Sequence, residues 1–273
     1  MQQTTQHSNF VINSAIDASI IEPAPAAVRK ICIINYKGGT GKTCTVVNLA
    51  HALAMKGKKV LIIDTDPQGS SGYHLGIDSS HTLYDLLVGN VGYKDCIVRA
   101  RDNLDIITAN ERLFPAEMAL SKMKNREMIL HQRLSGLNKY YDFILVDCAP
   151  SINLLNQNSL TFSEEVYLPV SMEYLSLVGI KQLLNNIKII NKIFKRNLTI
   201  QKIIPTFYDR RNTKSEKVMT SLRRVFEPII SSPVRANVAL SESAGVRQTI
   251  FEYAPQSKGA EDYNKLAEEV LNG

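Results

Sequence analysis

The fold of this chain is decided by Asn35-Tyr36-Lys37-Gly38-Gly39-Thr40-Gly41-Lys42-Thr43. This glycine-rich stretch joins a short apolar run to a segment whose apolar residues recur at helical spacing, which is the setting that a phosphate-binding loop requires. Glycines let the backbone curl so that successive N–H groups and the helix N-terminus face one anion. Lys42 can then reach the β- and γ-phosphates of a nucleotide, and Thr43 offers its hydroxyl to Mg²⁺.

Carboxylates stand at the ends of two further apolar runs. Asp147 ends the run 143–147, Asp64 ends the run 60–64, and Asp66 follows Asp64 after one residue. An acid at the end of a buried strand costs free energy unless it is paired, so a ligand role for Asp147 is favoured over a structural one. The stretch 143–150 also resembles a Walker B motif, and this resemblance implies that Asp147 anchors Mg²⁺, directly or through water.

The pattern outward from the loop predicts one α/β domain with the fold of a P-loop nucleotide hydrolase. Short apolar runs alternate with longer helical periodicities from Arg29 onward, which is typical of a twisted, mainly parallel sheet with helices on both faces. Strands are predicted at 31–35, 60–64, 104–108, 143–147, 166–170 and 200–207. Helices are predicted from the loop to Gly57 and at 83–88, 117–137, 154–160, 175–194, 213–226 and 260–271, with an irregular stretch before the last one.

Composition bounds the remaining possibilities. The 273 residues, 44% of them apolar, suffice for a large core. Residues 1–28 are almost uncharged, rich in Gln, Ser, Thr and Ala, and include Pro23 and Pro25, so they are predicted to be a flexible or partly ordered leader ahead of the domain 29–273. With no apolar run of 18 residues and no Lys or Arg before Arg29, a cytoplasmic protein without membrane association is expected.

The loop departs from the strict P-loop pattern in a specific way. Tyr36 stands where the first glycine is expected, and Lys37 adds a second lysine, giving K-G-G-x-G-K-T. This resembles the deviant Walker A motif of the ParA and MinD superfamily. Residues 64–69 resemble that superfamily's D-x-D-P-Q-G signature, and residues 168–174, 204–211 and 254–260 resemble three further segments in the right order. The likeness covers roughly residues 30–271 and favours the ParA family.

The resemblance implies an ATP-driven switch with named residues. In that family the extra lysine crosses a dimer interface to the partner's nucleotide, so Lys37 would act in trans, Asp66 would orient the attacking water, and Asp64 would support the metal or the loop. The implied catalytic residues are Lys37, Asp66 and Lys42. The implied metal site comprises Thr43, Asp147 and Asp64. The implied ATP-binding residues are Lys37, Gly38, Gly39, Thr40, Gly41, Lys42, Thr43 and Cys44. Slow, partner-stimulated hydrolysis is expected.

A basic segment suggests DNA as a ligand. The segment from Lys181 to Arg224 contains twelve basic residues and two acids, which gives it a net charge of +10 in a chain whose total is +6. Such a surface can neutralise duplex phosphates without sequence preference, and the binding would weaken as salt rises. Two arginines that the family associates with DNA are Ala236 and Ala239 here. The predicted contacts are Arg210, Arg211, Lys214, Lys217, Arg223 and Arg224, with Arg235 and Arg247 as possible compensation.

The implied partners are a second copy of the chain in an ATP-dependent homodimer, non-specific double-stranded DNA on the nucleoid, and a ParB-like activator. Plasmid and chromosome cargo both stay open. A MinD-like membrane- or protein-positioning ATPase is the alternative, although the last helix is acidic and short for a membrane anchor. A nitrogenase-reductase-like redox protein would need paired cysteines. The four present, Cys32, Cys44, Cys96 and Cys148, are widely spaced and are predicted to be reduced and buried.

Overall fold

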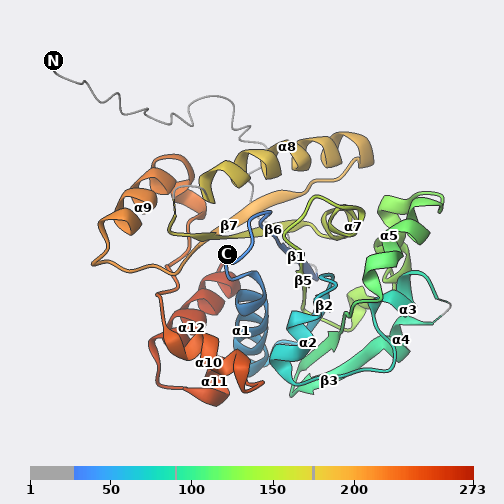
Figure 1. The fold of residues 1–273 in the computed structure, drawn as a ribbon, viewed down its shortest axis with the longest axis horizontal. Helices are drawn as coiled ribbons and strands as arrows, with labels where there is room; N and C mark the ends of the chain where they lie inside the picture. Colours follow the sequence, from blue (N-terminus) through green and yellow to red (C-terminus); the bar gives the residue numbers. More distant parts are fainter. Residues whose placement is uncertain (1–27, 90, 174–175) are drawn as a thin grey trace.

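The computed structural model describes residues 28–89, 91–173 and 176–273, so the predicted leader lies outside the described residues except for Val28. These residues form a seven-stranded sheet in the order β3-β4-β2-β5-β1-β6-β7 (Figure 1). All neighbouring strands are parallel except β3 and β4, which pair antiparallel. The predicted fold class, a mainly parallel sheet within a P-loop architecture, is confirmed. The strands are β1 Arg29–Ile33, β2 Val60–Asp64, β3 Ile97–Arg101, β4 Leu104–Ile107, β5 Phe143–Asp147, β6 Glu165–Ser171 and β7 Thr199–Thr206.

Two hydrophobic cores lie on opposite faces of the sheet. One packs against α3, α5, α6, α7, α8 and α9, and the other against α1, α11 and α12. The helices are α1 Lys42–Met55, α2 Ser70–Leu75, α3 Leu83–Leu87, α4 Tyr93–Cys96, α5 Leu113–Ser121, α6 Ile129–Arg133, α7 Leu154–Phe162, α8 Ser176–Phe194, α9 Thr213–Phe226, α10 Val238–Gly245, α11 Ile250–Tyr253 and α12 Lys258–Leu271. Among the described residues, none of these helices has both the length and the apolar content to cross a membrane.

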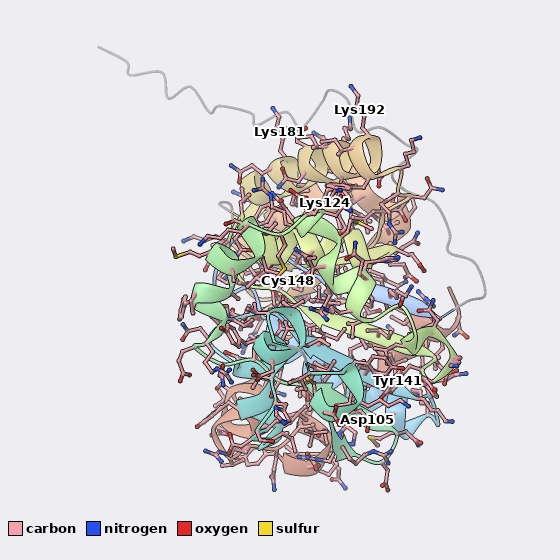
Figure 2. The ribbon with its side chains drawn as sticks, turned by 90° about the vertical axis from the view of Figure 1, so that its right-hand side faces the viewer. Asp105, Lys124, Tyr141, Cys148, Lys181 and Lys192 are labelled. Atoms are coloured by element: carbon pink, nitrogen blue, oxygen red, sulfur yellow. The ribbon has the colours of Figure 1, made fainter. Side chains whose placement is uncertain are left out.

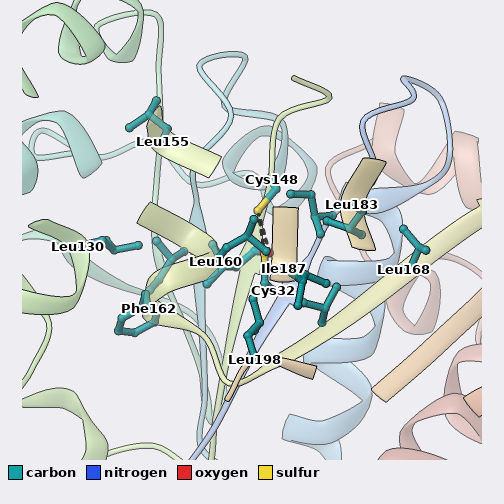
Figure 3. Close-up of a cluster of buried hydrophobic side chains, with 14 of the residues drawn as sticks. Cys32, Leu130, Cys148, Leu155, Leu160, Phe162, Leu168, Leu183, Ile187 and Leu198 are labelled. Atoms are coloured by element: carbon teal, nitrogen blue, oxygen red, sulfur yellow. Dashed lines mark hydrogen bonds between the residues drawn. The ribbon is translucent and has the colours of Figure 1, made fainter. Parts of the chain in front are cut away.

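The cysteines belong to the packing of the molecule. All four are free thiols; Cys32, Cys96 and Cys148 are buried and Cys44 is half-buried. Figure 3 shows the core around two of them, with the sulfur atoms of Cys32 on β1 and Cys148, the residue after β5, 3.3 Å apart. The prediction of buried thiols is confirmed for three of the four.

The predicted helix 117–137 is wrong. The chain there forms α5, a single 3₁₀ turn, α6 and a second 3₁₀ turn. Asn125 takes a left-handed conformation with φ 55°, which an α-helix cannot contain. The side chain of Asn158 on α7 then accepts a hydrogen bond from the Leu130 N–H at 3.0 Å and donates to the Arg126 carbonyl at 2.8 Å. A long-range partner therefore satisfies backbone groups that a continuous helix would have paired locally.

Some elements were not predicted from the sequence. β3 pairs with β4 around a turn that contains Asn103 in a left-handed conformation with φ 59°. α10 and α11 lie in the stretch predicted to be irregular. Asn237 caps α10 by accepting from the Ala239 N–H, and Thr249 opens α11 with a capping box. Both caps were visible as sequence signals, but the helices are too short for their periodicity to be recognised.

The sheet aligns the ends of the strands that carry the predicted site. Ile33 at the end of β1 pairs in register with Asp147 at the end of β5, and Asp64 at the end of β2 pairs with the same aspartate. All three strands are parallel, so their carboxyl ends meet at one edge of the sheet. The loop that follows β1 therefore lies beside both carboxylates.

Candidate nucleotide-binding site

The glycine-rich loop curls into a cradle at the edge of the sheet where β1, β2 and β5 end, and hydrogen bonds to β6 and β7 hold it in place. Gly39 and Gly41 have φ of 70° and 82°, conformations that strain any residue with a side chain. α1 begins at once with Lys42. The loop is held from outside because the Thr206 hydroxyl at the end of β7 donates to the Thr40 carbonyl at 2.9 Å. The Asn35 amide likewise donates to the Pro169 carbonyl of β6 at 2.8 Å.

Lys42 lies inside this cradle. Its side chain is largely buried, and its ammonium donates to the Lys37 carbonyl at 3.3 Å. Burial lowers the pKa of Lys42, whereas the nearby Asp147 carboxylate favours the charged form. A desolvated ammonium among curled backbone N–H groups is suited to a phosphate group, which would replace the lost hydration with charge-assisted hydrogen bonds.

One carboxylate oxygen of Asp147 is unsatisfied within the part of the chain that the structure describes. Its Oδ2 accepts from the Ser71 hydroxyl at 2.8 Å, while its Oδ1 is buried and has no hydrogen-bond partner among the described residues. Burial raises the pKa of Asp147 to about 6, although hydrogen bonds from Thr43 and Ser71 and the charge of Lys42 act against this rise. An unsatisfied buried carboxylate oxygen beside the Thr43 hydroxyl fits a hard divalent cation such as Mg²⁺.

Asp64 holds the loop that follows it. Its two carboxylate oxygens accept from the backbone N–H groups of Asp66 at 3.0 Å and Ser71 at 2.9 Å. Burial raises the pKa of Asp64 well above its usual value, and the negative charge of Asp147 raises it further. Of the two roles predicted for Asp64, support of the loop has direct contacts in the structure, and the metal role stays a prediction.

Asp66 is positioned by the loop that Asp64 supports. It is half-buried, and its Oδ1 accepts from the Gln68 N–H at 3.0 Å. Gly69 ends the turn with φ 63°, and a Cβ at this position would lie 2.5 Å from the Ala109 carbonyl oxygen. The close approach of two backbone segments fixes the turn. Asp66 also lines a cavity of about 300 Å³, together with Ala149 and Pro150.

Lys37 does not share the cradle with Lys42. Its ammonium pairs with the carboxylate of Glu173, which follows β6, and its N–H donates to the Asn35 side chain at 3.0 Å. The Lys37 side chain is 29% exposed and that of Glu173 is 69% exposed. The two lysines of one loop therefore lie in different environments, one buried in the cradle and one at the surface.

A cavity of about 450 Å³ opens next to the loop. This volume lies within the range of small-molecule sites. The P-loop side is formed by Gly41, Thr43 and Cys44. The other walls come from α2, from the end of β7, from the segment 234–244 and from α12; they include Tyr73, His74, Thr206, Phe207, Val234, Arg235, Asn237, Leu240 and Tyr263. Thr206 and Phe207 belong to the segment 204–211 that the sequence singled out, whereas Tyr73, His74 and Tyr263 join them only through the topology.

His74, which lines this cavity, is expected to make the stability of the protein dependent on pH. Burial lowers the pKa of His74 to about 4, and among the described residues its buried Nε2 has no hydrogen-bond partner. A histidine with a depressed folded-state pKa contributes stability above its unfolded pKa of about 6.5, and this contribution is lost as the pH falls towards 4. The His74→Gln variant should lack this dependence. At pH 5 the wild type should lose about 2 kcal/mol of unfolding free energy relative to the variant, compared with pH 7.5.

Urea denaturation of the nucleotide-free protein at pH 5, 6 and 7.5 would measure this difference. His81→Gln is the matched control because His81 is exposed and lies only a few residues away. If the stability difference between wild type and His74→Gln were the same at every pH, the neutral buried imidazole would have no part in the pH dependence.

The residues predicted to contact DNA fall into three groups. Six of them are exposed and lie together on α9 and the loop before it: Arg210, Arg211, Lys214, Lys217, Arg223 and Arg224. Arg235 neighbours this loop through a bridge with Tyr208, but its guanidinium is bonded to Asp262 at 2.6 Å and Glu261 at 2.7 Å. Arg247 lies apart, with its guanidinium 5.1 Å from the ring centre of Tyr73.

Known proteins resemble this chain over most of its length. A family model described as an AAA domain matches residues 28–200. The sporulation initiation inhibitor protein Soj of Bacillus subtilis (strain 168) is 39% identical over 245 residues, covering 88% of this chain and 97% of Soj. The chromosome partitioning protein ParA of Caulobacter vibrioides (strain NA1000 / CB15N) is 36% identical, covering 90% and 94%. A structure of cobyrinic acid a,c-diamide synthase from Mycobacterium smegmatis with bound ADP and magnesium superimposes with a TM-score of 0.79 at 30% identity, covering 90% and 94%.

Proposed function

We propose, from the premise that this chain belongs to the ParA family of partition ATPases, that it is an ATP-driven switch. In the proposed cycle the chain binds ATP and Mg²⁺, dimerises, and binds DNA without sequence preference. A ParB-like activator then stimulates hydrolysis, and the cycle positions a plasmid or a chromosome on the nucleoid. The observation that carries the proposal is the separation of the two loop lysines, since Lys42 lies in the cradle and Lys37 lies at the surface.

The phosphates of the nucleotide would bind in the cradle, and its adenosine would bind in the neighbouring cavity. The backbone N–H groups of residues 38–43 and the Lys42 ammonium would bind the phosphates. The adenosine would occupy the cavity bounded by Thr206, Phe207 and Tyr263. Thr43 and the unpartnered Oδ1 of Asp147 would hold Mg²⁺, which when bound neutralises charge on the β- and γ-phosphates.

Hydrolysis needs only positioning and charge neutralisation from the protein. We assign the orientation of the attacking water to Asp66, because its turn is held by Asp64 and by the contact of Gly69 with Ala109. Hydrolysis that relies on one water-orienting carboxylate should be slow, which suits a switch that has to persist in its ATP state until a partner acts.

Lys37 is assigned to the second subunit's nucleotide. Within its own chain it is engaged by Glu173, so it is not placed on the cradle that Lys42 occupies. In an ATP-bound dimer the ammonium would exchange this carboxylate for phosphate oxygens across the interface. A cation supplied in trans stabilises the charge of phosphoryl transfer as an arginine finger does.

The α9 surface is the proposed DNA contact. Its apolar residues, including Val218, Leu222 and Phe226, are buried, so the basic residues face solvent. Lys214, Lys217 and Arg224 are spaced by three and seven residues, which places them on one side of the helix. Dimerisation would bring two such surfaces onto one duplex and double the number of phosphates neutralised.

The variant Lys214→Ala/Lys217→Ala/Arg223→Ala/Arg224→Ala tests this surface. It should still bind ATP, but its affinity for random-sequence duplex DNA with ATP and Mg²⁺ should fall at least about 100-fold. The slope of log affinity against log salt should become less negative by about 3 to 4 units per subunit in contact. Fluorescence anisotropy with no nucleotide, with ADP and with ATP, each at several salt concentrations, would measure both quantities.

The matched control replaces four exposed lysines elsewhere, Lys94, Lys122, Lys124 and Lys139, by alanine. This control loses the same formal charge and should keep the wild-type salt slope within about one unit. Equal losses in the two variants would mean that net charge alone governs binding. Wild-type DNA binding that is independent of ATP would contradict the switch itself.

The last helix contrasts with that of a membrane-positioning ATPase. The apolar residues of α12, among them Tyr263, Leu266 and Val270, are buried in the core that also contains α1. Its apolar face is therefore already used for packing. A membrane-binding amphipathic helix has to keep such a face available for lipid.

A further inference from the structure

Residues of α7 and α8, together with Tyr36 and Glu127, line an apolar groove. Figure 1 shows where the two helices lie. This α7–α8 groove has a volume of about 320 Å³, and its apolar lining includes Tyr36, Ile152, Leu160, Ile189, Ile193 and Phe194. Ile152, Ile189 and Ile193 are 58%, 53% and 63% exposed, although isoleucine is among the residues most often buried. A contiguous apolar surface of this kind is typical of a place where another segment packs.

The floor of the groove also contains an unsatisfied polar atom. Asn156 is 1% exposed, and its amide nitrogen donates to the Ala149 carbonyl at 2.8 Å. Among the described residues its Oδ1 has no hydrogen-bond partner, and this atom has almost no exposed surface. A buried acceptor without a donor costs free energy, and a rearrangement that exposed it to the N–H of an occupant would recover part of that cost.

One of the two helices that line the groove, α8, also carries exposed lysines. Figure 2 shows Lys181 and Lys192 projecting from α8, away from the body of the molecule. Among the described residues that line the groove, the single acid is Glu127, and it is paired with Arg126 at 3.0 Å. An occupant with apolar residues and a few acids would complement this surface, whereas a basic occupant would be repelled.

The chain itself contains a segment with this chemistry. Residues 1–27 include no Lys or Arg, and their acids are Asp17 and Glu22. Their apolar residues include Ile12, Ile16 and Ile20, which recur at intervals of four. No other segment outside the described residues is longer than two residues.

The chain also enters the described structure at the matching end of the groove. Val28 packs on the core that contains α7 and α8. The Lys30 ammonium lies 5.4 Å from the ring centre of Phe162, the last residue of α7. Thr199 follows α8, and its N–H donates to the Glu164 carbonyl at 3.2 Å. The Glu164 N–H in turn donates to the Lys30 carbonyl. Residues 22–27 could extend up to about 20 Å from this point.

We propose that residues 10–22 of the leader dock in the α7–α8 groove of their own chain. The isoleucines of the leader would cover Ile189 and Ile193, and Asp17 and Glu22 would lie near the lysines of α8. The docked leader would also contact Tyr36, whose hydroxyl accepts from the Asn186 amide at 2.7 Å. Tyr36 directly precedes Lys37. The docked leader would therefore lie next to the lysine that, in the proposed dimer, leaves Glu173 for the nucleotide of the second subunit.

Photocrosslinking in the full chain tests the docking. With p-benzoylphenylalanine in place of Ile193, the major intramolecular crosslink should map to residues 10–22 by mass spectrometry. The double variant Ile16→Asp/Ile20→Asp should lower its yield at least about tenfold, because two apolar contacts are replaced by desolvated charges. The same probe in place of Met55, which is 62% exposed on α1, is the control and should give only background crosslinks to the leader.

Mixing isotope-labelled and unlabelled protein shows whether the crosslinked leader belongs to the same chain or to a second copy. Crosslinks that join two peptides of the same isotope support the proposal. Crosslinks between isotopes, crosslinks from position 193 to other parts of the chain, or a yield unaffected by the leader variant would each overturn it. The assay contains neither nucleotide nor DNA, so its outcome is independent of the proposed ATP switch. A failure here would leave the assignment of the nucleotide site intact.

Discussion

Replacing Lys42 by alanine should lower the affinity for ATP at least about 100-fold. Lys42 is the only one of the two loop lysines that lies in the cradle, and charge-assisted hydrogen bonds to phosphate are worth about 1.5–3 kcal/mol each. A loss of two such bonds corresponds to two or more orders of magnitude in affinity. Isothermal titration with ATP–Mg²⁺ and with ADP–Mg²⁺ would measure the loss.

The same variant should lose every later step of the cycle. Without bound nucleotide, neither ATP-dependent dimerisation nor DNA binding should be detected by light scattering or anisotropy. The variant Lys37→Ala distinguishes the roles of the two lysines, because it should bind ATP as a monomer and fail to dimerise. Lys139→Ala, an exposed lysine far along the chain, serves as the neutral control. A Lys42→Ala protein that still dimerised with ATP would refute the switch mechanism.

Replacing Asp66 by alanine should abolish turnover and preserve ATP binding. The carboxylate lies on the loop after β2 and is not among the groups of the cradle, so its removal leaves the phosphate and Mg²⁺ ligands in place. Loss of a group that positions or deprotonates the nucleophile costs about 10² to 10⁴ in rate. Single-turnover hydrolysis with radiolabelled ATP should therefore slow at least about 100-fold, while the ATP affinity changes less than about threefold.

The blocked Asp66→Ala protein should also stay on DNA. In a competition experiment with excess duplex, its dissociation in the presence of ATP should be much slower than that of the wild type, whether or not an activator is added. Asp102→Ala, which removes an exposed carboxylate at the β3–β4 turn, should behave as the wild type. Rapid hydrolysis by Asp66→Ala would remove the water-orienting role from this residue.

The sequence predicted the local chemistry of the site better than its surroundings. Phosphate binding requires glycines and lysines at fixed spacing, and a strand that ends in an acid is visible as a continuous apolar run, so the cradle and Asp147 could be found from the residues alone. Tyr73, Leu240 and Tyr263 belong to helices far apart in the chain and meet only in the folded sheet, so no local pattern marks them. The register of β1, β2 and β5 supplies that information.

The errors in the secondary structure have a similar origin. The apolar periodicity of 117–137 is compatible with one helix, but hydrogen bonds from Asn158 compete with its backbone pairing. Asn103 and Asn125 both adopt left-handed conformations, which asparagine tolerates better than most residues, and each lies where the predicted structure is missing or broken. The two asparagines are sequence signals for a turn or a helix break, whereas the apolar periodicity around Asn125 favours one continuous helix.

The helix α12 forms one wall of the cavity that is proposed to hold adenosine. α12 supplies Tyr263 to the cavity, and its Asp262 clamps Arg235 on the opposite side through bonds at 2.6–3.0 Å. Tyr263 also touches Cys44 on α1, immediately after the phosphate loop. A deletion that begins at Lys258 removes one side of the cavity proposed to hold adenosine. Comparisons of shortened forms of this protein would therefore report on nucleotide retention before they report on any partner.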